Sequence, residues 1–417
     1  MINKLKKLKQ FLNENFISGL KSKDAMVKNI ALLYLYCFFI RMNFALPIEL
    51  LFFVSLSQSY SDAMKVFFVA YMTGTILSVP LGLISDKFGR KKVAVLCSCC
   101  RLIAAILYAS AGTYSALITA AVFAGFYRFS SPNADTFLYE SLASKQKVEK
   151  YHECLSKVKS VSSFALSVGA LFCGVFYYFL SLRGVFVVTV IPMFLAFVVS
   201  LFLKEASFHK EAMSNPFKHV VKALSYFKKN KRLFCFSIAD STHYGLNEAS
   251  FTLNAAFFKT IMPVEFLGVL RFFGYFVSSI ASFMSSKIGK LIGVEKTILL
   301  GAMSDNIVNI FSVLFANWLS PLFKTVGSAC FGVYSPATGS FIQKEISNEE
   351  RATLVSMTTL LNTGFYSVGT LLIGWLADLY TPYTAMLIGY TSALLFNTLF
   401  IFAFKQKGVE KINQKSS

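Results

Sequence analysis

The sequence predicts an all-α membrane protein with twelve transmembrane helices in two related bundles of six. Apolar residues make up 55% of the 417 positions and charged residues only 15%, and the mean hydropathy is +0.58, which lies outside the range of soluble proteins. The apolar residues gather into twelve runs of about 20 residues or more, each long enough to cross a hydrocarbon core of about 30 Å. The runs lie at 29–56, 63–84, 93–112, 115–139, 158–180, 184–203, 233–258, 264–286, 295–315, 319–341, 352–376 and 383–404.

The positions of Lys and Arg predict the orientation of these spans. With the amino terminus in the cytoplasm, 33 of the 41 Lys and Arg lie on the cytoplasmic side, and four arginines lie inside helices. This asymmetry predicts cytoplasmic termini and an even number of spans. The net charge of +20 does not indicate a nucleic-acid partner, because the basic residues lie between apolar runs and not on one folded face. The residues assigned to the outer side are Lys65, Arg183, Lys259 and Lys324.

The longest internal loop divides the spans into six and six. We expect an amphipathic cytoplasmic amino terminus, a first bundle, a cytoplasmic linker with an amphipathic helix, a second bundle and a cytoplasmic tail. Their boundaries are 1–28, 29–203, 204–232, 233–404 and 405–417.

The two halves also repeat weakly in sequence. The stretch Ser85–Arg90 is echoed by Ser285–Lys290, and Ser131-Pro132 in the fourth span has a counterpart in Ser335-Pro336 in the tenth. Such an internal repeat predicts two pseudosymmetric halves.

A charged turn, Gly82 to Lys92, separates the second and third spans and reads G-L-I-S-D-K-F-G-R-K-K. Its two glycines let the backbone turn, and the Asp86 carboxylate can cap a helix end or pair with a base. We expect Asp86 to meet the amino end of the eleventh span at Ser347–Arg351, where Ser347 and Glu350 have capping-box spacing.

This turn resembles the loop 2–3 signature of the major facilitator superfamily of secondary transporters, G-x-L-A-D-R-x-G-R-K-x. The residues at the family positions are Gly82, Asp86, Gly89, Arg90 and Lys91, with Lys87 in place of the family arginine. The resemblance implies a transporter and not an enzyme, working as a monomer in the bacterial inner membrane.

Two further stretches resemble bacterial facilitators loosely grouped with multidrug and tetracycline exporters. These are Ser130–Leu142 and Arg351–Met357. The chain departs from the exporters in the fifth span, where residues 167–174 lack the proline of their G-x-x-x-G-P-x-x-G-G motif.

Charged residues inside the first and fourth spans are candidates for the substrate site, because a charge in a membrane is costly unless it is paired or faces water. Arg41 lies about 18 Å from the cytoplasmic end of its span at 1.5 Å per residue, and Arg128 lies at a similar depth. Arg128, Ser131 and Asp135 have the spacing of one helix face. Both arginines are predicted to bind substrate or to act in coupling; the alternative is that they are structural partners of Asp135 or Asp240.

The seventh span carries a second polar stripe. Asp240, His243 and Asn247 share one helix face, with Glu248 beside them. In the family the first, fourth, seventh and tenth spans line a central cavity, so the resemblance implies that both stripes face the substrate path. His243 alone is interpreted first as a hydrogen-bonded packing residue. Arg101 and Asp305 are interpreted as structural, because the family places the third and ninth spans peripherally.

These residues predict a secondary transporter that works by alternating access and is coupled to protons through Asp135 or Asp240, with Glu248 next. Export of a small organic solute is favoured. The solute is expected to bear a carboxylate or a comparable acceptor, because an arginine offers a planar fork to such groups. The first alternative is an uptake symporter for an amino acid or nucleoside, and the second is a membrane sensor or scaffold that does not transport. No cofactor or metal is expected, and no nucleotide-phosphate loop is present in the sequence.

Overall fold

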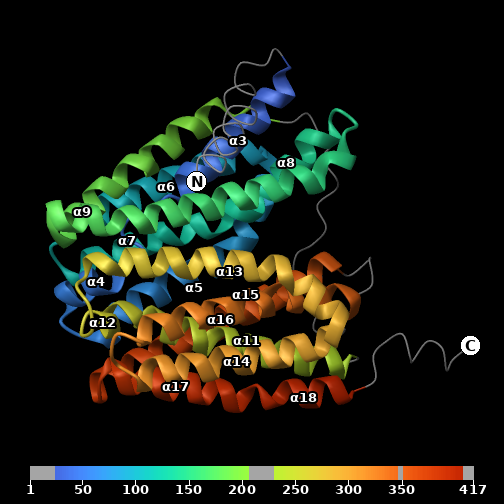
Figure 1. Cartoon of the computed structure of the whole chain (residues 1–417). Helices are drawn as coiled ribbons and strands as arrows, with labels where there is room; N and C mark the ends of the chain where they lie inside the picture. Colours follow the sequence, from blue (N-terminus) through green and yellow to red (C-terminus); the bar gives the residue numbers. More distant parts are fainter. Residues whose placement is uncertain (1–23, 206–229, 346–350, 407–417) are drawn as a thin grey trace, which may run out of the picture. The chain divides into compact units, whose positions relative to one another are not determined.

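The computed structural model describes residues 24–205, 230–345 and 351–406 of the chain. Within these residues every regular element is a helix, which confirms the predicted all-α class (Figure 1). The amphipathic helices expected within 1–28 and 204–232 and the tail from 405 fall largely outside the described residues.

Helices of the first half follow the predicted spans, with some interruptions. Span four is divided by the 3-10 turn η2 (Tyr127–Phe129). Spans five and six share the label α9 but are two helices separated at Ser181, whose φ of 65° is not helical. The helices are α3 (Ala25–Arg41), α4 (Glu49–Ser57), α5 (Tyr60–Phe88), α6 (Arg90–Ser110), α7 (Tyr114–Phe126), α8 (Ser130–Ala143) and α9 (Tyr151–Phe202), with a short 3-10 turn, η3 (Val148–Lys150), before α9.

Helices of the second half also match the predicted runs. They are α11 (Lys231–Thr252), α12 (Asn254–Phe258), α13 (Glu265–Ile292), α14 (Val294–Leu314), α15 (Ser320–Glu345), α16 (Arg351–Leu379), α17 (Pro382–Phe396) and α18 (Thr398–Lys405). By length and composition alone, six helical stretches of the described residues can cross a membrane: Arg90–Ser110, Val148–Phe202, Glu265–Ile292, Val294–Leu314, Met357–Leu379 and Pro382–Lys405.

The first span is not the continuous helix 29–56 that the apolar run predicts. Helix α3 ends at Arg41, and α4 begins at Glu49. Between them the Asn43 side chain accepts a hydrogen bond from the Ala45 amide at 3.0 Å, and Pro47 disfavours helical geometry at the residue before it. Arg41 is therefore a helix-terminal residue next to a break.

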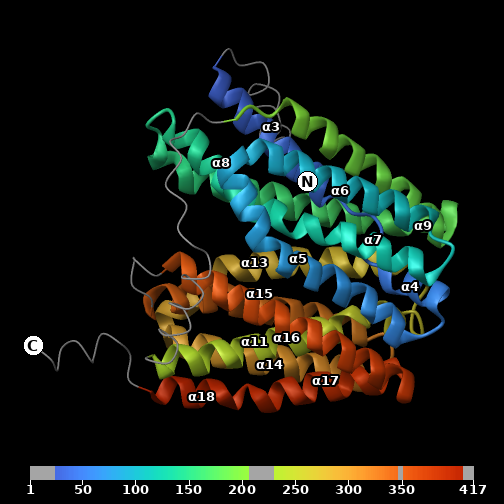
Figure 2. The ribbon, with the colours of Figure 1, turned by 180° about the vertical axis from the view of Figure 1, so that it is seen from behind.

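Contacts divide the chain into two compact units. The N-terminal unit comprises Met1–Pro47 and Thr73–Met213, and the C-terminal unit comprises Ile48–Met72 and Ser214–Ser417. In the N-terminal unit α9 packs against α3 and α6, and in the C-terminal unit α15 packs between α13 and α14 while α11 packs against α16 and α17 (Figures 1 and 2).

The sequence echo between the halves corresponds to a shared contact. Ser85 Oγ donates to Asn133 Oδ1 at 2.8 Å within the N-terminal unit, and Ser285 Oγ donates to the Val333 carbonyl at 2.6 Å within the C-terminal unit. In each half a serine near the end of the second helix of the bundle therefore fixes that helix to the fourth.

The turn that follows is shifted between the halves. Gly89 connects α5 to α6 with a φ of 102°, and Gly293 connects α13 to α14 with a φ of 89°. Only glycine adopts such values at little cost. The counterpart of Gly89 is therefore Gly293; the echo in sequence pointed to Gly289, which lies inside α13.

Gly245 allows α11 and α16 to pack closely. A Cβ atom added to Gly245 would lie 2.6 Å from the Phe365 carbonyl carbon, whereas one added to Gly364 would meet nothing within 4 Å. We expect Gly245→Ala to lower the free energy of unfolding by about 1–3 kcal/mol, because overpacking displaces backbone. Gly364→Ala is the matched control and should unfold like the wild type. Thermal unfolding in detergent measures both; equal stabilities would contradict the packing described.

Candidate functional site

The charged segment Gly82–Lys92 forms the end of α5, the turn at Gly89 and the start of α6, and it contacts the stretch Ser130–Leu142. These two sequence motifs therefore lie together. Arg90 Nε donates to Glu140 Oε1 at 2.9 Å, and Arg90 Nη1 donates to Ser85 Oγ at 2.9 Å. Asn133 Nδ2 donates to the Arg90 carbonyl at 2.9 Å. The Arg90–Glu140 pair is mostly buried, so it joins α6 to α8 more strongly than an exposed pair would.

The start of α6 carries a second carboxylate. The amides of Arg90 and Lys91 donate to the Glu205 side chain at 2.8 and 2.9 Å, so Glu205 caps this helix. Lys87 and Gly82 lie in the last turns of α5, next to Gly89. The predicted partner of Asp86 cannot be assigned, because the Asp86 side chain and residues 346–350 lie outside the described part of the structure.

Two arginines of the N-terminal unit contact one aromatic ring. The guanidinium of Arg41 lies 5.6 Å from the centre of the Tyr127 ring, and that of Arg101 lies 4.7 Å from it. Arg101 Nε is buried and has no hydrogen-bond partner among the described residues. Arg101, interpreted from sequence as peripheral, therefore belongs to the same cluster as Arg41. Arg128 follows Tyr127 in the sequence, and its side chain packs against Gly74 of α5.

Asp135 pairs with a lysine and not with these arginines. Lys159 Nζ contacts the two carboxylate oxygens of Asp135 at 2.8 and 2.6 Å and Ser131 Oγ at 3.4 Å. Ser131 and Asp135 thus share a face of α8, as their spacing predicts. Lys159 lies on α9, so the partner of Asp135 comes from a helix that the sequence stripe could not indicate.

The polar stripe of α11 is buried inside the C-terminal unit. Asp240 is 6% exposed, His243 is 0% exposed and Asn247 is also buried. They share a face, as predicted, but that face packs against polar residues of α14, α15 and α16. The Tyr334 hydroxyl donates to Asp240 Oδ1, and Asn362 Nδ2 donates to Oδ2 at 3.3 Å.

His243 and Asn247 connect this stripe to Asp305 of α14. His243 Nδ1 lies 3.0 Å from Asn397 Oδ1, and Nε2 lies 3.1 Å from Asn247 Nδ2. Asn247 Nδ2 also donates to Asp305 Oδ2 at 2.9 Å. Glu248 lies beside this cluster and interacts electrostatically with Asp305 and Lys324.

The assignment of Lys324 to the outer side of the membrane is wrong. It was placed outside the membrane by charge counting, but its side chain is 6% exposed. Its Nζ donates to Asn309 Oδ1 at 2.6 Å and to the Tyr390 hydroxyl at 2.8 Å. Asn309 Nδ2 donates in turn to Asp305 Oδ1 at 2.7 Å. The sequence signal was a lysine within the apolar run 319–341, and it was missed because the residue lies near the end of that run.

Asp378 caps the first turn of α5, and all the residues concerned belong to the C-terminal unit. Its carboxylate accepts from the Tyr60 amide at 2.7 Å, the Ser61 amide at 2.8 Å and the Ser59 hydroxyl at 2.6 Å. A carboxylate at a helix amino terminus satisfies amides that lack partners in the helix.

We expect Asp378→Ala to expose those amides. Loss of such a cap costs about 0.5–1 kcal/mol, so the hydrogen exchange of the Tyr60 and Ser61 amides should accelerate several-fold. Asp62→Asn is the control. Asp62 is an acid in the same turn, but its carboxylate pairs with Lys65 at 2.7 Å, whereas the Tyr60 and Ser61 amides donate to Asp378. Unchanged exchange in Asp378→Ala, measured by mass spectrometry on peptides of this turn, would show that the cap does not form in solution.

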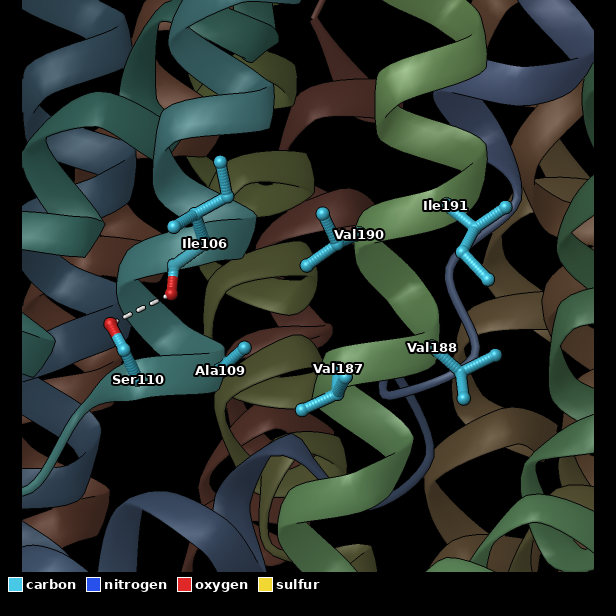
Figure 3. Close-up of a pocket in the computed structure, with 7 residues that line it drawn as sticks. All are labelled: Ile106, Ala109, Ser110, Val187, Val188, Val190 and Ile191. Atoms are coloured by element: carbon cyan, nitrogen blue, oxygen red, sulfur yellow. Dashed lines mark hydrogen bonds between the residues drawn. The ribbon is translucent and has the colours of Figure 1, made fainter.

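A groove between α6 and α9 has a volume of about 490 Å³ but lacks recognition chemistry (Figure 3). Its lining is aliphatic apart from Ser110, whose hydroxyl donates to the Ile106 carbonyl at 2.9 Å. An open apolar surface of this kind suits lipid chains better than a charged solute.

The comparisons with known proteins agree with this fold. A family model described as Major Facilitator Superfamily matches residues 30–365. No curated protein matches the sequence significantly.

Several solved transporters have a similar structure. A mutant of the nucleoside transporter NupG aligns with a TM-score of 0.78 at 15% identity, covering 90% of this chain and 99% of that one. A bacterial homolog to the human lysosomal transporter Spinster, in an inward-facing and unoccupied conformation, aligns with a TM-score of 0.70 at 14% identity, covering 92% and 96%. A POT family transporter in complex with a thioalcohol-conjugated peptide aligns with a TM-score of 0.70 at 13% identity, covering 89% and 95%.

These identities are low, so the solved structures support the fold alone, whereas the family model covers most of the sequence. The chain therefore belongs to the major facilitator superfamily and is a multi-pass membrane transporter, not an enzyme.

Proposed function

We propose that this transporter moves a small organic solute with an acidic group by proton-coupled alternating access. The supporting observation is the cluster of Arg41 and Arg101 on the Tyr127 ring. Arginine stays charged at any working pH and presents a planar set of donors that matches a carboxylate or phosphate. Among the described residues the buried Arg101 Nε has no hydrogen-bond partner, and a bound acid would supply one.

The charge of the N-terminal unit supports an anionic or zwitterionic solute. Asp135 pairs with Lys159, so it is not a counter-ion for the arginine cluster. Positive charge within a membrane protein is costly unless it is paired or faces water. A solute carboxylate would supply the missing counter-charge.

Proton coupling is proposed because carboxylates lie inside helices of the C-terminal unit. Asp240 and Asp305 are 6% and 4% exposed, and their contacts include neutral hydroxyl and amide groups. Such a group can gain or lose a proton as it meets each side of the membrane. The chain lacks a nucleotide-phosphate loop, which favours an ion gradient as the energy source.

Export is the proposed direction, on the strength of the exporter-like stretches Ser130–Leu142 and Arg351–Met357. The alternative is uptake of an amino acid or nucleoside, and the likeness to the nucleoside transporter NupG favours including nucleosides in any test. The location proposed is the bacterial inner membrane with both termini in the cytoplasm, because Lys and Arg gather on one side of the spans.

A flux assay in proteoliposomes tests the proposal. The panel comprises glutamate, succinate, uridine, dialanine and the lipophilic cation tetraphenylphosphonium, each with and without a pH gradient. We expect movement of a carboxylate-bearing member to depend on the gradient; accumulation with proton entry indicates a symporter, and extrusion an exporter. Transport of the lipophilic cation alone, or transport indifferent to the gradient, would overturn the proposal.

A further inference from the structure

We infer that His243 and Asp305 together form a proton-binding site in the C-terminal unit, and that this site is where protons couple to solute movement. The inference rests on the proposed function, because it assigns the coupled proton to particular atoms. It also changes the interpretation of His243 as a packing residue and of Asp305 as a peripheral structural residue.

The contacts of His243 define where its hydrogen lies when the ring is neutral. Nδ1 lies 3.0 Å from Asn397 Oδ1, an oxygen that can only accept, so Nδ1 carries the hydrogen. Nε2 lies 3.1 Å from Asn247 Nδ2, a nitrogen that can only donate, so Nε2 presents its lone pair. The two shortest contacts of the ring therefore agree on one neutral tautomer, and the longer contact of Asn306 Nδ2 with Nδ1, at 3.3 Å, fits that tautomer only with the Asn306 amide rotated.

That tautomer places two proton acceptors opposite each other. His243 Nε2 lies 3.7 Å from Asp305 Oδ2, and both atoms share the amide hydrogens of Asn247 Nδ2. A proton taken from water at one membrane face would bind between these atoms, as an imidazolium beside a carboxylate or as a carboxylic acid beside an imidazole. Either form gains a charge-assisted hydrogen bond between these two atoms, in place of the hydrogen bond that Nε2 now accepts from Asn247 Nδ2. The same proton is released to water at the other face.

Amide groups around the ring have unused acceptors that suit the protonated state. Asn247 Oδ1 and Asn306 Oδ1 are buried and have no hydrogen-bond partner among the described residues. The Asn247 amide contacts Nε2, and the Asn306 amide lies 3.3 Å from Nδ1. Protonation changes Nε2 from an acceptor into a donor, and rotation of the Asn247 amide would present its free oxygen to that nitrogen; rotation of the Asn306 amide would present its oxygen to the hydrogen on Nδ1 in both states. Buried polar atoms are rarely left unpaired, so the Asn247 oxygen indicates a second hydrogen-bonded state of the cluster.

Lys324 sets the charge of the cluster. It is joined to Asp305 through Asn309, with hydrogen bonds of 2.6 and 2.7 Å. A charged Lys324 balances an ionised Asp305, so His243, Asp305 and Lys324 together are neutral without the extra proton and carry one positive charge with it. A buried net charge is unfavourable in a membrane, and an anionic solute in the protein would offset it. Loading of the proton and binding of the solute therefore favour each other.

Several other charged or titratable groups surround this site from the elements packed around it. They are Tyr334 and Cys330 on α15, Tyr390 on α17, Asp240 and Glu248 on α11, and Arg271 on α13, which acts on Lys324.

A titration of the wild-type protein tests proton binding with the proton itself as the probe. The chain has four histidines, His152, His209, His219 and His243, and ¹⁵N-histidine NMR distinguishes the neutral tautomers from imidazolium; the His243 signal is identified by its loss in His243→Gln. We expect the Nδ1-protonated tautomer at high pH and a change in the Nε2 signal on acidification. A His243 signal that stays constant down to the lowest pH at which the protein remains folded would overturn the inference.

Transport by substituted proteins tests coupling. A difference of one pH unit across the membrane is worth 1.36 kcal/mol per proton. A wild type that exchanges one proton per solute should therefore maintain about a tenfold solute gradient across a membrane with that pH difference. His243→Gln removes the titrating ring, and Asp305→Asn/Lys324→Met removes the pair without leaving an unpaired charge. We expect both to exchange solute at equal pH and to build no gradient. Ser237→Ala, a buried change on the same helix at a hydroxyl that has no partner within the described part of the chain, should behave like the wild type.

The outcomes separate the two proposals. If the wild type does not respond to the pH gradient, the proposed function fails whatever the NMR titration shows. If the wild type responds and His243→Gln responds equally, the proton site lies elsewhere and this inference fails alone. If the substituted proteins do not fold, replacement of His152, His209 and His219 by Gln leaves His243 as the one histidine signal, and its titration decides the matter.

Discussion

Lys324→Met is expected to remove most of the folded protein from the membrane fraction. The substitution leaves the Asp305 carboxyl buried at 4% exposure without the cation that balances it. Removing one partner of a buried ion pair costs about 3–5 kcal/mol, which is a large part of the stability of an ordinary domain. The loss arises because the Nζ that reaches Asp305 through Asn309 is gone. Size-exclusion profiles and thermal unfolding in detergent measure the effect.

The double substitution Asp305→Asn/Lys324→Met is the control for this prediction. It removes both charges and keeps an amide where the carboxylate accepts from Asn309 and Asn247. A buried ion pair can often be replaced by neutral residues at little cost, so the double substitution should recover most of the folded protein. Wild-type stability of Lys324→Met alone would show that the lysine does not compensate Asp305.

Arg101→Lys is expected to weaken solute binding by about ten- to a hundredfold, since a hydrogen bond to a charged group contributes about 1.5–3 kcal/mol and each 1.4 kcal/mol is tenfold. Lysine keeps the positive charge but lacks the planar fork of arginine, and it lacks the Nε that has no partner in the structure. Arg41→Lys should act in the same direction, because Arg41 contacts the same Tyr127 ring. The affinity of a transported panel member, measured by competition, checks both.

Arg183→Lys is the control for the arginine cluster. Arg183 lies in the same unit, and its guanidinium donates to the Ala111 carbonyl at 2.6 Å, away from Tyr127. Its substitution should leave solute affinity unchanged. If Arg41→Lys and Arg101→Lys also retain wild-type affinity, or if the solute proves to be a lipophilic cation, these arginines are structural.

The sequence predicted the fold class because its signal is local and repeated. A run of apolar residues long enough to cross a bilayer identifies a span without knowledge of its neighbours. The turn at Gly82–Lys92 identified the superfamily by its own residues, and a family model over 30–365 confirmed it. The limits of this local signal are visible in the first span, where Asn43 and Pro47 interrupt an apolar run that reads as continuous.

The candidate site was predicted only in part. Helical spacing placed Asp240, His243 and Asn247 on one face, because the period of a helix fixes which of its own residues share a face. It could not indicate that this face is buried, since burial depends on the helices packed against it. Charge counting placed Lys324 outside for the same reason, because hydropathy does not report whether a lysine near the end of a span finds a buried partner.

The sequence by itself determined the number of spans, the family and most of the charged residues inside helices, with Lys324 as the exception, because each follows from composition or spacing within one segment. Only the tertiary structure decided the partners. Asp135 meets Lys159 of α9, Arg101 joins Arg41 on Tyr127, and Asp305 of α14 meets His243 of α11. Each of these contacts joins different helices. Their formation depends on how each helix is rotated and shifted against its neighbours, and packing of complete side-chain surfaces sets that rotation, not the periodicity of any single helix.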